Sequence, residues 1–455
     1  AKVSNNKIVF TKNDLGDSGI SISFGNFQIY SFDLIYHLEN KNLYPVSTEI
    51  ALPPDTNYQK ILIDNINPRP TNVSIDKDGN WLARYILSPN KSMDIKVLGK
   101  AKVYLNPKEE YLDPIMAKEY LKQNQYWDLE NSKIKELAKD LKTPYAIYQY
   151  VYKTLGYDFS RVQSNSPRLG AANALKNPDS AVCLEFTDLF IAIARAVGIP
   201  AREINGYAYT SNSSQRPLSF VKDILHAWPE YYDYDKKTWI MIDPTWANTT
   251  GGVDYFNTLD FDHIAFVIKG LSSTYPVPAG GYKLSTDENK KDVGVSIDSA
   301  FKEKTANITS EILFPDLILS GLSINGSIKA LNIGNSLVNK QEIKVSTSFL
   351  SPKSQSVFIK DIPPYGFQII SLNFDKTPIL TNAKDTIKIT AGNSNVLKHI
   401  KILPFYAHKI FILGGLAIAS FSVIILLIAY IYRRLSLFKQ KRESALRGQS
   451  QQFKE

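Results

Sequence analysis

An uncharged apolar segment near the C-terminus sets the first constraint on how this chain can fold. Residues 410–432 read IFILGGLAIASFSVIILLIAYIY, 23 residues without a charged side chain. At a rise of about 1.5 Å per residue, a helix of this length crosses a hydrocarbon core of roughly 30 Å. Unbroken hydrophobicity over this length argues against a helix buried in a soluble core. We therefore expect one transmembrane helix over 408–432, with the membrane as a partner of the chain.

Basic residues on the two sides of this segment predict its orientation. Six Lys or Arg residues follow it within 433–447, and three Lys residues precede it within 398–409. The larger number marks the cytoplasmic side. We expect a cell-membrane protein with a single span, a basic cytoplasmic tail over 433–455 and the N-terminal bulk outside the cytoplasm. The chain opens without an apolar segment, so we also expect that a signal peptide preceded Ala1.

The net charge of +9 does not indicate a nucleic-acid partner. The tail 433–455 carries seven Lys or Arg residues and two Asp or Glu residues, so five of the nine excess charges belong to it. The remainder of the chain shows no clustered basic stripe of the kind that phosphate binding requires. We expect no nucleic-acid partner.

The length of 455 residues is too great for one ordinary core, and the pattern of apolar residues changes along the chain. Short β-like runs such as YQKILID and WLARYIL, with a turn at 78–80, predict a β-rich N-terminal domain over 1–105. Helical spacing then begins at Asp113 and recurs to Leu155, and this region opens the domain predicted over 106–275. Residues 276–300 read as a linker. Alternating runs over 301–405 predict an Ig-like β-sandwich that serves as a stalk.

Cys183 is the one cysteine of the chain, so an intramolecular disulfide is excluded and a Cys-based zinc site is not expected. The apolar residues of 184–197 share one helical face, and Gly198 followed by Pro200 ends the helix. A start near Ser180 places Cys183 in the first turn. Backbone N–H groups and the helix dipole stabilise an anion there, which favours the reactive thiolate. A buried structural cysteine is the alternative that this position alone leaves open.

The segment HAWPEYYDYDKKTWIMIDPTW, residues 226–246, predicts a β-hairpin around 233–237. If Asp233 pairs with Lys236, then His226 lies directly opposite Asp243. Cross-strand neighbours have Cβ atoms roughly 4.5–5.5 Å apart, within reach of an imidazole–carboxylate contact. Such a carboxylate fixes the tautomer of the ring and stabilises the imidazolium. A surface His–Asp pair is the alternative reading of this hairpin.

The stretches AVCLEFTDLFIAIARAVGIPAREINGY, HAWPEYY and WIMIDPTW resemble the core motifs of the transglutaminase-like superfamily, in the same order and spacing over about residues 140–250. The resemblance implies an α+β fold: a papain-like or transglutaminase-like cysteine enzyme core, flanked by the β-rich domain and the Ig-like sandwich. It implies that Cys183 is the nucleophile, His226 the general base and acid, and Asp243 the residue that orients His226. Gly206 matches a structural position of the family. Ala181 departs from the pattern, which has glycine two residues before the cysteine; a left-handed backbone there would be strained by alanine.

These residues predict an extracytoplasmic transglutaminase-like enzyme that acts on amide bonds, of Gln side chains or peptides, through a thioester. A cysteine peptidase or amidase of cell-surface or cell-wall peptides uses the same triad and is the first alternative. A non-catalytic surface scaffold that retains the fold is the second. The expected partners are peptide or protein substrates at the cell surface. No cofactor and no metal is expected, since no acidic loop with ligand spacing stands out.

Overall fold

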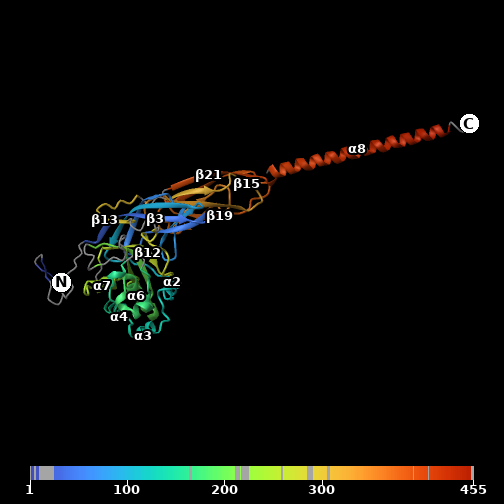
Figure 1. Ribbon diagram of the computed structural model, residues 1–455. Helices are drawn as coiled ribbons and strands as arrows, with labels where there is room; N and C mark the ends of the chain where they lie inside the picture. Colours follow the sequence, from blue (N-terminus) through green and yellow to red (C-terminus); the bar gives the residue numbers. More distant parts are fainter. Residues whose placement is uncertain are drawn as a thin grey trace. The chain divides into compact units, whose positions relative to one another are not determined.

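The computed structural model describes residues 2–4, 7–9, 25–162, 166–210, 216, 225–257, 260–283, 291–304, 308–392, 394–407 and 409–451. The chain divides into two compact units. One consists of Ala1–Thr309, Ala330–Gln341 and Ile359–Gln368, and the other of Ser310–Lys329, Glu342–Phe358 and Ile369–Glu455. Figure 1 labels several of the elements named below, among them α6, β3 and β12.

The N-terminal region is β-rich, as the sequence predicts. Besides a short pair, β1 (Lys2–Ser4) and β2 (Lys7–Val9), it forms two antiparallel sheets, of order β13-β3-β8-β5 and β4-β7-β6. The turn expected at 78–80 joins β6 to β7, and Gly79 takes a positive φ of 97° there. The strands of these sheets are β3 (Phe27–Asn40), β4 (Val46–Leu52), β5 (Gln59–Asn67), β6 (Asn72–Ile75), β7 (Trp81–Leu87), β8 (Lys91–Tyr104) and β13 (Val293–Asp298).

Strand β13 corrects the expectation of a linker over 276–300. It pairs antiparallel with β3 along its whole length, from Val293 opposite Leu34 to Asp298 opposite Ile29. Only Val293 of this strand is fully buried, and an alternating surface strand of mixed polarity is hard to distinguish from a loop by composition. Residues 293–298 therefore belong to the N-terminal sheet.

The helices expected after Asp113 are present. Pro144 begins α4 at its first position, and the Thr143 hydroxyl caps that helix by accepting from the Ala146 N–H at 3.2 Å. The helices are α2 (Pro114–Glu119), α3 (Ser132–Asp140), α4 (Pro144–Thr154), α5 (Ala171–Lys176), α6 (Cys183–Val197) and α7 (Pro244–Thr249), with 3₁₀ turns η1 (Phe159–Arg161) and η2 (Pro178–Ser180).

Helix α6 is the centre of this part of the fold. It packs against α3, α4 and α5 and against strands β9 and β10. Figure 1 labels α6 with α3 and α4 nearby. Its residues from Phe186 to Arg195 are all buried, because the helix lies between other helices and a sheet of order β11-β10-β9-β12. The strands are β9 (Ala201–Ala208), β10 (Leu225–Asp233), β11 (Thr238–Met241) and β12 (His263–Lys269).

A buried cluster of charges ties α6 to this sheet. Arg168 contacts Asp188 of α6 and Glu203 of β9, and Lys269 of β12 lies 3.4 Å from Glu203. The indole N–H of Trp127 donates to Asp188 at 2.9 Å. Two carboxylates are thus matched by two cations, which is how charges are accommodated in an interior.

The β-rich region and the helical region share a core. Tyr207, Leu225, Ile264 and Phe266 of the sheet belong to the same buried cluster as the apolar faces of β3 to β8. The sheet that carries the candidate site is therefore packed on one face by helices and on the other by the β-rich region.

The remaining strands lie in two sheets, of order β14-β16-β19 and β15-β21-β20-β17-β18. That these sheets form an Ig-like sandwich stays a prediction. The strands are β14 (Ile308–Leu313), β15 (Leu317–Leu319), β16 (Ile324–Asn332), β17 (Gln341–Ser346), β18 (Ser354–Ile359), β19 (Phe367–Phe374), β20 (Ala383–Ala391) and β21 (Ser394–Leu403).

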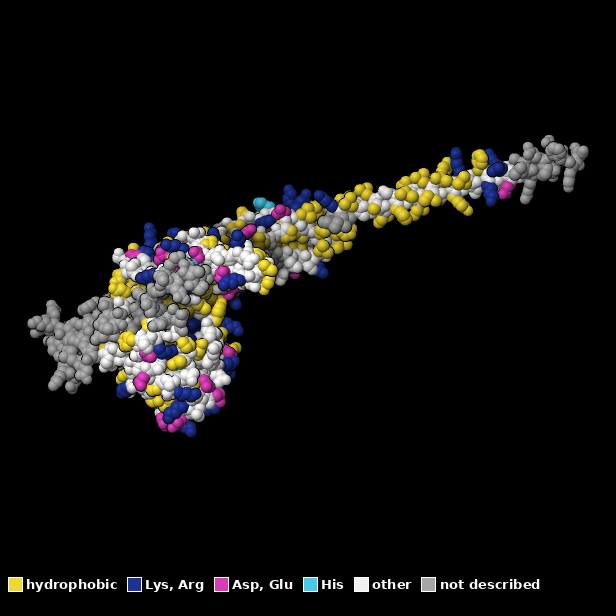
Figure 2. Space-filling model, viewed as in Figure 1, with side chains coloured by type: hydrophobic (Ala, Val, Ile, Leu, Met, Phe, Trp, Pro, Cys, Tyr) yellow, Lys and Arg dark blue, Asp and Glu magenta, His cyan; other side chains and the backbone are white. Residues whose placement is uncertain are grey.

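Within the described part of the chain, one helix is long and apolar enough to cross a membrane. After a 3₁₀ turn, η3 (Phe405–Ala407), helix α8 runs over Lys409–Gln451, and its candidate span is Phe411–Ser444. Figure 2 shows hydrophobic side chains along most of its length and Lys and Arg side chains toward its end. None of that apolar surface is buried within the protein, which is typical of a helix that lies in lipid.

Candidate active site

Cys183 is the first residue of α6, which confirms that the cysteine stands in the first turn of a helix. Gly198 ends the helix in the left-handed conformation, with φ 93°, as its position in the sequence predicts. The Cys183 side chain is buried, with 1% of the residue exposed. A reagent or substrate that reaches this sulfur must therefore be small or must displace what covers it.

Glu185 holds the start of α6 in place, a role that the sequence analysis missed. Its carboxylate accepts from the N–H of Val182 at 3.0 Å and from the N–H of Leu169 at 2.7 Å. Arg161 lies 3.4 Å from the same carboxylate and also donates to the carbonyl oxygen of Ser180. Glutamate at the third position of a helix is the signal that could have identified this cap.

Ala181 adopts an ordinary extended backbone, with φ −91° and ψ 145°. Its N–H donates to the carbonyl oxygen of Gly156 at 3.3 Å, and its own carbonyl oxygen accepts from Asp158 at 2.8 Å. The strain considered for alanine two residues before Cys183 is therefore absent, because only a positive φ would require glycine.

The hairpin is present, but its register differs by two residues from the one expected. Asp233 pairs with Thr238 rather than with Lys236. The turn holds four residues, because the Asp233 carboxylate accepts from the backbone N–H groups of Asp235 and Lys236, both at 3.0 Å, and Lys237 takes a φ of 52°. A shift by two keeps every side chain on its expected face.

His226 and Asp243 meet in spite of this shift, although not as a cross-strand pair. Strand β11 ends at Met241, and His226 lies opposite Gly206 of β9. A Cβ atom at Gly206 would lie 1.9 Å from the carbonyl oxygen of Ile264, so only glycine fits there. The His226 Nε2 atom lies 2.9 Å from Asp243 Oδ2, and both side chains are fully buried.

Asp243 uses both of its oxygens. Oδ1 accepts from the N–H groups of Thr245 at 2.9 Å and Trp246 at 3.0 Å and thereby caps α7, while Oδ2 faces His226. Burial by itself raises the pKa of Asp243, but the two histidines at Oδ2, His226 and His263, hold it well below its usual range. The helix cap adds to this stabilisation. Asp243 is therefore an anion that can only accept hydrogen bonds.

Aromatic rings enclose the imidazole of His226. The ring of Trp246 stacks on it, with centroids 5.2 Å apart and planes inclined by 18°, and the ring of Trp228 lies 5.9 Å away. Among the residues that the structure describes, no hydrogen-bond partner lies at His226 Nδ1, although this atom is buried. Since Nε2 faces Asp243, Nδ1 is the atom left for chemistry.

His263 is a second histidine at the same carboxylate, and its role was not predicted from the sequence. Its Nε2 atom lies 3.3 Å from Asp243 Oδ2, and its Nδ1 atom lies 2.9 Å from Asp260 Oδ1. Burial by itself lowers the pKa of His263, but Asp260 and Asp243 raise it to about 10. A histidine three residues after an aspartate, at the start of an apolar strand, was the available signal.

The spacing of His226, Asp243 and His263 would also suit a metal ion, since one ligand atom from each lies within 4.8 Å of the others. Both Nε2 atoms, however, are directed at the same oxygen of Asp243 at hydrogen-bond distances. Hydrogen bonds from the two rings to Asp243 therefore account for the contacts among the three groups.

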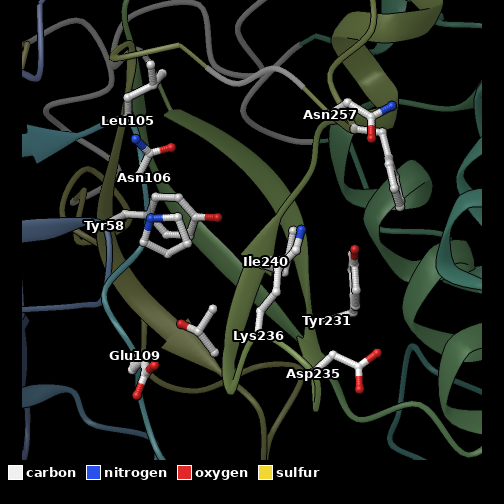
Figure 3. Close-up of a pocket in the computed structure, with 12 residues that line it drawn as sticks. Tyr58, Leu105, Asn106, Glu109, Tyr231, Asp235, Lys236, Ile240 and Asn257 are labelled. Carbon is white, nitrogen blue, oxygen red and sulfur yellow. The ribbon is translucent and has the colours of Figure 1, made fainter.

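The structure also has a pocket of about 490 Å³ away from these residues (Figure 3). One side is lined by Tyr58, residues 105–107 and Glu109, and another by the β10–β11 hairpin, with Tyr231, Asp235 and Ile240. None of Cys183, His226 and Asp243 lines it. The lining of this pocket therefore does not support its assignment as the site of Cys183, His226 and Asp243.

Part of this chain matches the model of a known protein family. Residues 128–244 match the model of the transglutaminase-like superfamily. A comparison with curated protein sequences finds no match.

Among solved structures, the chain is similar to a candidate cysteine protease from Cytophaga hutchinsonii, at 18% identity over 60% of this chain and 99% of that chain, with a TM-score of 0.37. It is also similar to the periplasmic domain of TgpA from Pseudomonas aeruginosa, at 14% identity over 51% of this chain and 100% of that chain, with a TM-score of 0.29. The assignment rests on the family match. Residues 128–244 of this chain are a transglutaminase-like superfamily domain.

Proposed function

We propose that this domain is a cysteine-dependent enzyme that cleaves amide bonds through a thioester on Cys183. The observation that carries the proposal is the pairing of His226 with Asp243, which leaves His226 Nδ1 buried and without a partner among the described residues. Helix α6, which begins at Cys183, packs against β10, which carries His226. A nucleophile, a base and an orienting carboxylate are the three groups that such a reaction needs.

The hydrogen bond to Asp243 determines which nitrogen of His226 acts as the base. An ionised carboxylate only accepts, so Nε2 must carry the proton of the neutral ring. Nδ1 then holds the lone pair, and it can take the proton from the Cys183 thiol. The positive ring formed in this step is stabilised by the Asp243 charge and by the stacked Trp246 ring.

The reaction proceeds in two halves. The Cys183 sulfur attacks the amide carbonyl carbon, and the tetrahedral intermediate collapses as His226 Nδ1 returns its proton to the leaving nitrogen, which breaks the C–N bond and forms a thioester. A water molecule or an amine then loses a proton to Nδ1 and attacks the thioester. The C–S bond breaks, and the sulfur regains its proton from Nδ1. The position of Cys183 at a helix N-terminus supports the anionic sulfur in both halves.

The first prediction concerns the reactivity of the thiol. We expect iodoacetamide, a small reagent that suits a buried sulfur, to alkylate the wild-type protein at neutral pH at least about 10²-fold faster than His226→Ala, because the variant lacks the base. Since Cys183 is the one cysteine, mass spectrometry assigns the label without ambiguity. His399→Ala is the matched control, because His399 is an exposed residue of β21 that forms a hydrogen bond with Thr386.

Equal alkylation of the wild type and His226→Ala would contradict the proposal and would favour a scaffold that retains the fold. Where alkylation depends on His226, a Gln-containing peptide offered with a fluorescent amine distinguishes the two acceptors. Incorporation of the amine identifies a transglutaminase, and release of ammonia or of a peptide fragment without incorporation identifies a hydrolase.

We also propose that α8 anchors this domain outside the cytoplasm, where peptides or proteins of the cell surface are its substrates. Six Lys or Arg residues follow the apolar stretch and three precede it, which supports a cytoplasmic C-terminus. A protease added to intact spheroplasts is expected to degrade the domain and to spare an epitope placed after Glu455. Survival of the domain with loss of the epitope would indicate the opposite orientation.

A further inference from the structure

His263 lies between two carboxylates in the interior. Its side chain is 0% exposed, and each ring nitrogen faces a different acid, Nε2 toward Asp243 and Nδ1 toward Asp260. Its ring also lies against those of Trp228 and Trp246, with centroids 4.9 and 4.7 Å apart. Neither His263 nor Asp260 lies within the segment 128–244 that matches the family model.

The protonation state of His263 follows from these partners. The pKa values of Asp243 and Asp260 are both held below the usual range, chiefly by the neighbouring histidine charges that overcome the effect of burial. Two ionised carboxylates can only accept, so both nitrogens of His263 donate, and the ring is a buried imidazolium.

We propose that His263 is a positioning residue, which holds Asp243 Oδ2 at His226 and shares the charge of that carboxylate between two rings. This inference rests on the function proposed above. The two Nε2 atoms converge on one oxygen, at 2.9 Å from His226 and 3.3 Å from His263. Two donors fix the carboxylate more tightly than one. The shared charge also stabilises the positive ring of His226 less than an undivided charge would.

Other charged groups around His263 leave this effect in place. Asp262 lies two residues beyond Asp260, and burial raises its pKa to about 6. Arg216 lies 3.7 Å from Asp262 and offsets its charge. Among the residues that the structure describes, the other titratable groups at the ring are Asp243, Asp260 and His226, which are members of the same chain of contacts.

A matched pair of variants distinguishes the two roles of His263, which are to hold Asp243 by a hydrogen bond and to share its negative charge. In His263→Gln the amide nitrogen takes the place of Nε2 and still donates to Asp243, but the positive charge is lost. In His263→Asn the amide nitrogen takes the place of Nδ1, so the donor to Asp243 is lost as well. The readout is the rate of Cys183 alkylation by iodoacetamide in the full chain, from about pH 5 to about pH 10.

In His263→Gln, we expect the inflection of this pH profile to move up by about one pH unit, because a positive charge beside Asp243 and His226 is lost. In His263→Asn, we expect the same movement together with an alkylation rate lower by about 10-fold at neutral pH. His263→Gln leaves Asp260 without its partner, whereas the amide nitrogen in His263→Asn still donates to it. The double variant of His263→Gln with Asp260→Asn is therefore included to remove that charge. It should show the same upward movement as His263→Gln.

Profiles of His263→Gln and of the double variant that coincide with the wild type would overturn the charge-sharing role. Equal rates for His263→Gln and His263→Asn would overturn the holding role. A merely structural histidine would lower the urea midpoint of unfolding and leave the inflections where they are. Alkylation of the wild type that does not depend on His226 is a different result, because it refutes the proposed function and not the role of His263.

Discussion

Asp243→Asn is expected to leave the domain folded and to reduce alkylation of Cys183 to the rate of His226→Ala, about 10²- to 10⁴-fold below the wild type. Asparagine keeps the oxygen that accepts from Thr245 and Trp246, so α7 retains its cap. Its amide group, however, donates where Oδ2 accepted. His226 and His263 must then each present the lone pair of Nε2 to this group. In His226 the proton moves to Nδ1, which can no longer serve as the base.

Asp243→Ala provides the contrast. It removes the cap as well as the orienting charge, so we expect the same slow alkylation with a free energy of unfolding lower by about 1 kcal/mol or more. Iodoacetamide kinetics and urea denaturation measure the two effects. An asparagine variant that is alkylated as fast as the wild type would show that Asp243 caps α7 and does nothing for His226.

Local sequence signals predicted much of the candidate site. The apolar face of 184–197, together with Gly198, fixed the start and the end of α6 closely enough to place Cys183 in its first turn. The parity of the aromatic-rich strands placed His226 and Asp243 on one face, and parity survives a register shift of two residues. These signals are reliable because they depend on residues that are close in sequence.

The parts that could not be predicted depend on contacts between distant segments. The turn after β10 has four residues because the Asp233 carboxylate binds the backbone, and the pattern of the strands does not reveal this. His263 reaches Asp243 from β12, a strand paired with β9, so no spacing in the sequence relates the two residues. Strand β13 adds to the N-terminal sheet from more than 250 residues away, next to a polar stretch that resembles a linker.

The buried charges around Arg168 lead to the second large prediction. Arg168→Met should lower the free energy of unfolding by about 3–5 kcal/mol, because the buried carboxylates of Asp188 and Glu203 lose the cation that they share, and among the described ion pairs only that of Lys269 with Glu203 is left. Arg84→Met is the matched control. Arg84 forms an ion pair with Glu49 on the surface, where its side chain is 56% exposed, so we expect a loss below about 1 kcal/mol.

The pH dependence of Arg168→Met identifies the cause. Burial already raises the pKa of Asp188 from 3.8 to about 7 in the wild type, and without the guanidinium burial raises it further. A carboxyl group with a raised folded-state pKa stabilises the fold below its unfolded pKa and ceases to do so as the pH rises through the folded value. Urea denaturation of Arg168→Met should therefore show stability that recovers as the pH falls from about 8 to about 5. A loss of stability that is the same at every pH in this range would show that the variant lost packing, and that unpaired charge is not the cause.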